Sequence, residues 1–143
     1  LPDVRRGSCA GGGARAAPGM LDHRRQIWSS DDTYAIGRLA VQEGTALIYP
    51  VSAIGAHVSV CPNHTVGRTT PFETRGDVAL LGTFGYELDI TRLTEEEKIL
   101  VKVQVEKYHK YNDMIREGDY DRLASAAENR YYDSWMIVGK DKS

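Results

Sequence analysis

Apolar side chains recur at helical spacing in the segment that follows Thr94. They are Val101, Val105, Tyr108 and Ile115. Thr94 and Glu97 have the spacing of a capping box, in which each side chain accepts a hydrogen bond from the backbone N–H of the other residue. Gly118 interrupts the pattern, and glycine often ends a helix. The sequence therefore predicts an amphipathic helix over residues 94–117.

Shorter apolar segments alternate with polar loops in the rest of the chain. Four of them have the composition of strands: 26–28, 46–60, 83–90 and 135–138. The second is mostly apolar, as expected of a strand buried on both faces, although Pro50 and Gly55 divide it. The segments between them carry the signals of helices and loops.

The first predicted helix carries Ile36, Leu39 and Ala40, and we expect Gly44 to close it. A long polar loop follows over 61–71. Pro71 stands at a position that suits the first turn of a second helix, because proline lacks the N–H that this turn leaves free. Helices are thus predicted between the successive strands.

Strands followed by loops and helices at this spacing are typical of βα units, which assemble into parallel sheets. A chain of 143 residues fits one α/β domain or part of one: either a small doubly wound sheet or a portion of a (β/α)8 barrel. Catalytic side chains lie at the carboxyl ends of the strands in both architectures. We expect the strands near 26–28, 54–59 and 84–89 to be parallel neighbours, with Asp31 at their carboxyl ends.

Two adjacent carboxylates, Asp31 and Asp32, lie between the first strand and the first helix. An aspartate before a helix most often caps it, because its carboxylate accepts hydrogen bonds from free backbone N–H groups. An aspartate at the carboxyl end of a strand can also transfer protons. Spacing alone leaves both interpretations open, and capping is the commoner of the two.

The charge of the chain is nearly balanced, with 18 Lys and Arg against 20 Asp and Glu and a formal net charge of −2. Such a chain lacks the positive field that holds nucleic acid or anionic lipid, so we expect neither a nucleic acid nor a membrane as a partner. No apolar run approaches the ~20 residues of a membrane span.

Cysteines and histidines are too few to suggest a cofactor site. Cys9 and Cys61 form neither a disulfide framework nor a metal site, and His57 and His64 have no third ligand in view. We expect the two histidines to hydrogen-bond to loop backbone. We also expect that no metal, nucleotide or disulfide is needed, so the prediction is that the protein has no cofactor.

Several stretches follow one another in a familiar order. They are SCAGGGAR, PGML, QIWSSDDTYAIGRLAVQEGTALIYP, GAHVSVCPNHTVGRTTPFETRGDVALLGTFGYELDIT and LTEEEK. Through them the chain resembles the C-terminal part of glycoside hydrolase family 36, the bacterial alpha-galactosidases, from about residue 7 to the end and most densely over 26–98. The resemblance implies the second half of a (β/α)8 barrel, about strands 5–8, over 1–117, and the beginning of a C-terminal β-domain over 118–143.

Members of this family hydrolyse terminal alpha-galactosyl residues of melibiose, raffinose and related sugars with retention, which requires two carboxylates about 5–5.5 Å apart. The resemblance places the general acid/base on Asp31, whereas Asp32 falls where the family has Asp or Asn. Because Asn caps a helix as well as Asp does, Asp32 fits the cap and Asp31 fits the proton chemistry. The family's nucleophile lies in a Lys-Trp-Asp-type motif on an earlier strand, and that tripeptide does not occur in these 143 residues.

The glycine-rich stretch near the start is, by composition, either a flexible linker or a loop that brings backbone amides close to a sugar. The resemblance implies the second role, with Cys9 and Gly12 touching the galactose. This part of the chain departs from the family pattern at several positions: Arg6-Gly7 replaces Phe-Glu, Arg15-Ala16-Ala17 replaces Arg-Phe-Asp, Asp22-His23 replaces a pair of tyrosines, and Tyr34 replaces an aspartate.

Three functional hypotheses follow. The first is a fragment of a retaining alpha-galactosidase that carries the general acid/base, lacks the nucleophile and is inactive alone. The second is a degenerate relative that binds sugars without catalysis. The third is a free-standing α/β module, which the resemblance over 26–98 disfavours. An alpha-galactoside is the expected partner in the first two cases. The resemblance allows a homo-oligomer in the complete enzyme, and the family's use of imported sugars favours the cytoplasm.

Overall fold

The structure, a computed structural model, describes residues 7–9 and 17–141 of the chain. Its strands are β1 (Gly7–Ser8), β2 (Gln26–Ile27), β3 (Gly55–Ser59), β4 (Thr83–Glu87), β5 (Asp119–Ala124) and β6 (Ser134–Val138). Its α-helices are α1 (Ala35–Ala46), α2 (Phe72–Ala79), α3 (Glu95–Glu117) and α4 (Ala126–Asn129), and short 3-10 helices are η2 (Pro18–Met20), η3 (Val51–Ala53) and η4 (Ile90–Arg92). Within the described ranges, no helix combines the length and the apolar character needed to cross a membrane.

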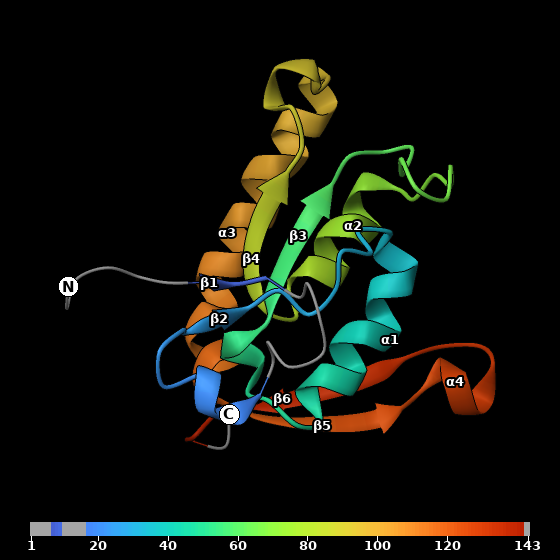
Figure 1. Ribbon diagram of the computed structural model, residues 1–143. Helices are drawn as coiled ribbons and strands as arrows, with labels where there is room; N and C mark the ends of the chain where they lie inside the picture. Colours follow the sequence, from blue (N-terminus) through green and yellow to red (C-terminus); the bar gives the residue numbers. More distant parts are fainter. Residues whose placement is uncertain (1–6, 10–16, 142–143) are drawn as a thin grey trace.

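The first four strands pair in parallel, which was predicted for the strands near 26–28, 54–59 and 84–89 but not for β1, whose segment was expected to be a loop or linker. β1 pairs with β2, and β3 pairs with β4 along its whole length. A parallel bridge between Ile27 and Ile54 connects the two pairs. Figure 1 shows that the loops after β3 and β4 leave from the same end of this pair. Side chains near the carboxyl ends of these strands are therefore brought toward one another.

The core of the molecule is built on β3. Ala56 and Val58 of this strand are fully buried and pack against Phe72 and Ala79 of α2. In Figure 1, α1 and α2 lie on one flank of β3, while α3 runs alongside β4 on the other. Four of the five residues of β3 are buried, because the strand is covered on both faces.

The long helix predicted after Thr94 is confirmed. Both bonds of its capping box are present: Glu97 N donates to Thr94 Oγ1 at 3.2 Å, and Thr94 N donates to Glu97 Oε2 at 3.0 Å. Gly118 follows the last helical residue. Every signal for this helix is local in the sequence, which is why its bounds could be predicted.

The expectations for residues 44–54 are wrong in two respects. Gly44 does not close the first helix, because α1 continues to Ala46. Glycine in a helix interior costs about 1 kcal/mol relative to alanine, and the helix tolerates that cost here. Residues 47–54 are also not a regular strand, since a turn and η3 precede the first residue of β3, Gly55. Pro50 lies in this irregular segment and has no backbone N–H to donate to a neighbouring strand.

Two further differences concern element ends and a missed strand. α2 begins one residue later than expected, because Pro71 is its N-cap. The polar segment before the last strand forms β5, which pairs with β6 in antiparallel fashion. Most side chains of β5 are exposed, so the segment lacks the apolar pattern that identifies a strand.

Two buried glutamines join neighbouring helices. Gln42 of α1 donates from Nε2 to Val78 O of α2 at 2.8 Å. Gln104 of α3 donates from Nε2 to Phe72 O, at the other end of α2, at 3.0 Å. The side chain of Gln104 passes so close to Gly76 that a Cβ at this position would overlap it.

Asn63 organises the loop between β3 and α2. Its Oδ1 accepts from the backbone N–H groups of Thr65 and Val66, both at 3.0 Å. Its backbone N–H donates to Arg68 O at 3.0 Å. Its Nδ2 donates to Thr33 Oγ1 at 3.0 Å, which links this loop to the segment that follows β2. One buried side chain thus fixes two loops at the carboxyl ends of their strands.

Gly76→Ala should destabilise the fold, because the added Cβ overlaps the hydrogen-bonded side chain of Gln104. Overpacking of this kind costs about 1–3 kcal/mol. Gly44→Ala is the matched control: its surroundings are open, and alanine in a helix interior is more stable than glycine by about 0.5–1 kcal/mol. The melting temperatures of the two variants should move in opposite directions. A Gly76→Ala protein as stable as the Gly44→Ala protein would show that Gln104 moves aside without loss.

Asn63→Ala should release the loop over 61–70, since it removes the acceptor of two amides and the donor to Thr33. We expect limited trypsin digestion to cut after the exposed Arg68 faster than in the parent protein. Asn129→Ala is the control, because Asn129 also accepts two amide hydrogen bonds, but in the loop between α4 and β6. It should leave cleavage after Arg68 unchanged. Parental cleavage rates in both variants would contradict the role assigned to Asn63.

Candidate active site

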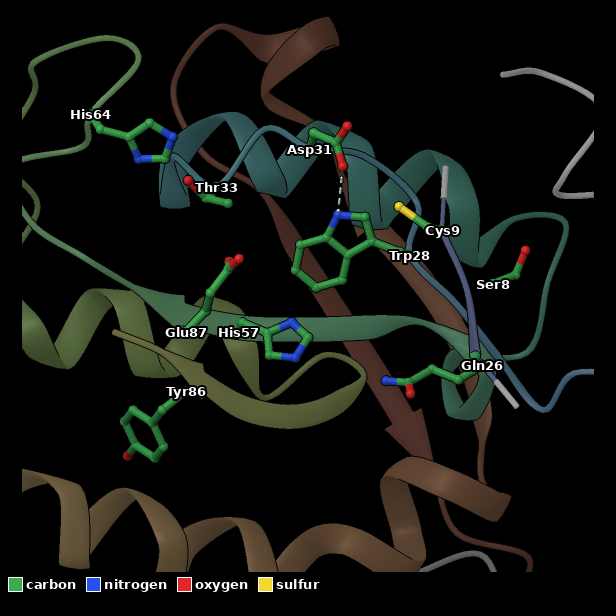
Figure 2. Close-up of a pocket in the computed structure, with 11 residues that line it drawn as sticks. Ser8, Cys9, Gln26, Trp28, Asp31, Thr33, His57, His64, Tyr86 and Glu87 are labelled. Atoms are coloured by element: carbon green, nitrogen blue, oxygen red, sulfur yellow. Dashed lines mark hydrogen bonds between the residues drawn. The ribbon is translucent and has the colours of Figure 1, made fainter. Parts of the chain in front are cut away.

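An open pocket of about 710 Å³ lies at the carboxyl ends of the parallel strands. Figure 2 shows the side chains that line it. They come from β1, β2, β3, β4 and the segments after β1, β2 and β3: Gly7, Ser8, Cys9, Gln26, Trp28, Asp31, Thr33, His57, His64, Tyr86 and Glu87. Two residues predicted for the site, Asp31 and Cys9, therefore line one pocket. Gly12, the third, lies outside the described residues.

Asp31 is held by the indole of Trp28. Trp28 Nε1 donates a hydrogen bond to Asp31 Oδ1 at 3.0 Å, drawn as a dashed line in Figure 2. The donor belongs to a partly buried ring, so this bond fixes the direction of the carboxyl group. Asp31 itself is exposed on the pocket wall, where a ligand can reach it.

Trp28 both lines the pocket and packs against the surrounding protein. Its ring centroid is 4.5 Å from that of His57, with the two planes at 53°. The guanidinium carbon of Arg38 lies 5.2 Å from the indole centroid, a distance at which a cation is attracted by the ring face. Trp28 therefore belongs both to the pocket wall and to the packing behind it.

Asp32 supports the turn before α1. Its Oδ1 accepts from Tyr34 N at 2.9 Å, and its own N–H donates to Ser30 Oγ at 3.0 Å. Tyr34 is the N-cap residue, so this bond falls earlier than the N2 or N3 amide that a capping side chain usually reaches. The other carboxylate oxygen lies so close to Gly37 that a Cβ there would overlap it. The negative charge therefore lies at the first turn, where the helix dipole favours it.

The electrostatic environment of the pocket favours a neutral His57. Burial lowers the pKa of this imidazole, the negative charge of Glu87 raises it, and the positive charge of Arg38 lowers it further. Its Nδ1 is buried and has no hydrogen-bond partner among the described residues. The expected hydrogen bond to loop backbone is thus absent at that nitrogen, because the ring packs against Trp28 instead. His64 is exposed and borders the same pocket.

Sequence reasoning missed Glu87 and Arg38. Glu87 is the last residue of β4, so the rule that functional side chains follow strand ends could have identified it. It accepts a long hydrogen bond from Ser59 Oγ, at 3.4 Å. Arg38 lies one turn after Ala35 on the buried face of α1, and a charged residue on such a face is a signal in itself.

The pocket offers no evident metal site. In residues 7–9 and 17–141, no group of three or more His, Cys, Asp or Glu side chains is arranged to hold a metal ion. Cys9 and Cys61 are both free thiols. The titratable groups that line the pocket are two carboxyl groups, two imidazoles, a thiol and the phenol of Tyr86.

Comparison with known proteins gives consistent matches. The melibiase family model matches residues 1–118. Alpha-galactosidase AgaA of Geobacillus stearothermophilus is 50% identical over 143 residues, which are 100% of this chain and 20% of AgaA. The bifunctional alpha-galactosidase/sucrose kinase AgaSK of Mediterraneibacter gnavus is 48% identical over 141 residues, which are 99% of this chain and 15% of that protein.

Solved structures agree with these matches. The crystal structure of a variant of GH36 alpha-galactosidase AgaA in complex with 1-deoxygalactonojirimycin has a TM-score of 0.95 at 50% identity, covering 100% of this chain and 20% of that chain. A second AgaA variant, in complex with raffinose, has a TM-score of 0.95 at 49% identity with the same coverage. The chain spans a fifth or less of the length of these relatives. Since the family model covers most of the sequence and the structural matches extend over all of it, the chain belongs to the melibiase family of glycoside hydrolases.

Proposed function

We propose that this chain is the part of a retaining alpha-galactosidase that supplies the general acid/base, Asp31. Its relatives at about 50% identity are named alpha-galactosidases, and a related structure holds raffinose. The observation that carries the proposal is the bond from Trp28 Nε1, which directs a carboxyl group into a pocket at the ends of parallel strands. The proposed substrates are terminal alpha-galactosides such as melibiose and raffinose.

The proposed mechanism gives Asp31 two tasks. In a retaining glycosidase, one carboxylate attacks the anomeric carbon while a carboxylic acid protonates the leaving oxygen, and the same group later takes a proton from water. Asp31 gives and then recovers this proton. The N–H of Trp28 can donate to an oxygen of either the neutral or the ionised carboxyl group, so it keeps Asp31 oriented through both steps. The attacking carboxylate comes from an earlier strand of the complete enzyme.

The proposal also assigns the two parts of the chain. Residues 1–117 would belong to the second half of a (β/α)8 barrel, and 118–143 would begin a C-terminal β-domain. The parallel pairing of β1 with β2 and of β3 with β4, with helices alongside, supports the first assignment. The change to an antiparallel hairpin directly after Gly118 supports the second.

Cys9 and Gly12 are the proposed contacts to the galactosyl ring. Cys9 supports the proposal because its exposed thiol lines the same pocket as Asp31. A degenerate relative that binds galactosides without hydrolysing them is the alternative, and the departures from the family pattern between residues 6 and 34 favour it. One of them, Tyr34, is accommodated, since the guanidinium carbon of Arg68 lies 5.7 Å from its ring centroid.

Asp31→Asn, made in a complete enzyme that contains this segment, should lower kcat/KM for melibiose by ~10²–10⁴-fold, because acid catalysis is typically worth that much. The loss should be smaller for a nitrophenyl galactoside, whose leaving group needs little protonation. Asp32→Asn should do much less, since the amide oxygen can still accept from Tyr34 N. Equal losses for the two variants, or full activity of Asp31→Asn on melibiose, would show that Asp31 is not the general acid/base and that both residues have a structural role. A complete protein that binds galactosides but hydrolyses none would support the alternative.

Cys9 should react with iodoacetamide faster than Cys61. Cys9 is exposed, whereas the sulfur of Cys61 is partly buried and hydrogen-bonded to the backbone of Thr70. If Cys9 contacts the sugar, saturating galactose should slow its alkylation and leave that of Cys61 unchanged. Mass spectrometry of tryptic peptides measures both rates in the complete enzyme. Unprotected Cys9 in an enzyme that hydrolyses galactosides would remove this residue from the site.

A further inference from the structure

Arg38 is the least exposed charged side chain among the described residues, at 3%. Its guanidinium donates three hydrogen bonds: Nη1 to Ser30 O at 2.9 Å, Nη2 to Gly55 O at 2.7 Å and Nε to Gln42 Oε1 at 3.3 Å. Burying a cation is costly unless its donors are satisfied, and here each nitrogen has an acceptor. Arg38 therefore belongs to the fixed framework behind the pocket.

Two of the contacts of Arg38 are to neighbours of Asp31. Ser30 directly precedes Asp31, so the bond to its carbonyl fixes the backbone next to the carboxylate. The guanidinium also lies against Trp28, and the N–H of this indole donates to Asp31 Oδ1. Arg38 thus holds both the backbone beside Asp31 and the hydrogen-bond donor of its carboxyl group.

We propose that Arg38 is a positioning residue for Asp31, acting through Ser30 and Trp28, so that the carboxyl group meets the leaving-group oxygen in the geometry that proton transfer requires. This inference rests on the proposed function, because it takes Asp31 as the general acid/base. Arg38 does not line the pocket, so its effect on the reaction passes through its neighbours.

The contacts explain why arginine stands at this position. The planar guanidinium reaches two carbonyls on separate segments while its carbon lies near the indole. The ammonium of lysine is a point charge and cannot form this fork. Burial lowers the pKa of Arg38, whereas the charges of Asp32 and Glu87 raise it. Since arginine stays protonated in proteins, the contacts persist across the working pH range.

Arg75 provides a matched control in the next βα unit. It is 9% exposed, its Nη1 donates to Ser59 O at 2.7 Å, and its guanidinium carbon lies 4.7 Å from the ring centroid of Phe72. Both arginines are therefore buried, bonded to a carbonyl and placed near an aromatic ring. Neither of these two contacts of Arg75 reaches Trp28 or the residue before Asp31, so a change there leaves the groups that hold Asp31 in place.

The experiment compares Arg38→Lys with Arg75→Lys in the complete enzyme. For each variant, kcat/KM is measured on melibiose and on a nitrophenyl galactoside. The value for melibiose is then divided by the value for the nitrophenyl galactoside. The folded fraction cancels in this ratio. Arg38→Lys should lower the ratio by ~10-fold or more, mainly through kcat, because misplacement of a catalytic group by 1 Å costs as much as ~10²-fold. Arg75→Lys should lower both activities equally and leave the parental ratio.

Asp31→Asn, measured in parallel, separates the two claims. An unchanged ratio in Asp31→Asn means that the proposed function fails. A lowered ratio in Asp31→Asn with a parental ratio in Arg38→Lys overturns the inference about Arg38 alone, as does an equal drop in Arg75→Lys. If Arg38→Lys does not fold, Gln42→Met keeps the arginine but removes the acceptor of Nε, so the guanidinium is held less firmly against Ser30 and Trp28. Its ratio should fall by a smaller factor, and a parental ratio there overturns the inference.

Discussion

Buried polar side chains that reach backbone carbonyls hold the helices of this protein on its strands. The bonds run from α1 to β3 and α2, from α2 to the end of β3, and from α3 to α2: Arg38 to Gly55 O, Gln42 to Val78 O, Arg75 to Ser59 O and Gln104 to Phe72 O. One such bond contributes only about 0.5–1.5 kcal/mol net, but a buried group left unpaired costs about 1–3 kcal/mol. The layers are therefore fixed in one relative position, since sliding would leave several groups unpaired at once.

This framework also determines where the candidate site can form. Parallel strands place the segments after β2 and β3 at the same end, and the bond from Asn63 to Thr33 joins these two segments. The backbone before Asp31 is held by the buried guanidinium of Arg38 in α1, which donates a hydrogen bond to Ser30 O. The buried side chains of Arg38 and Asn63 therefore fix the segment that carries the exposed carboxylate of Asp31. Such preorganisation lets a side chain act without first paying the entropy of ordering.

Sequence reasoning succeeded where the signal was local. The capping box of α3 and its apolar spacing lie within one segment, and the rule for strand ends was enough to place Asp31 beside a pocket. It failed where tertiary contacts decide, as at the exposed Gly44, which stays helical beside the buried Gln42 and Glu43, and at β5, which becomes a strand by pairing with β6. The bond from Trp28 to Asp31 depends on side-chain directions within a loop, which periodicity does not describe.

Near the carboxyl end of α1, the buried Glu43 also needs hydrogen-bond partners from a neighbouring segment. This carboxylate is 8% exposed and accepts from Arg122 Nη1 at 3.2 Å and from Ser125 Oγ at 3.0 Å, both in the segment after α3. A negative charge near the carboxyl end of a helix is unfavourable and, once buried, needs partners. The hydrogen bond to Glu43 and the negative charge of Glu128 raise the pKa of Arg122.

Docking of the β5–β6 hairpin therefore supplies the hydrogen-bond donors that the buried Glu43 needs near the carboxyl end of α1. The same helix carries Arg38 near its start. Gln42 and Glu43 are consecutive, so the bond to α2 and the bonds to the hairpin fix one turn of this helix from two directions. Rotation of α1 about its axis would break both sets of bonds and would also withdraw the guanidinium from Ser30 and Trp28. The hairpin after Gly118, although it does not line the pocket, thereby limits a rotation of α1 that would displace the proposed acid/base.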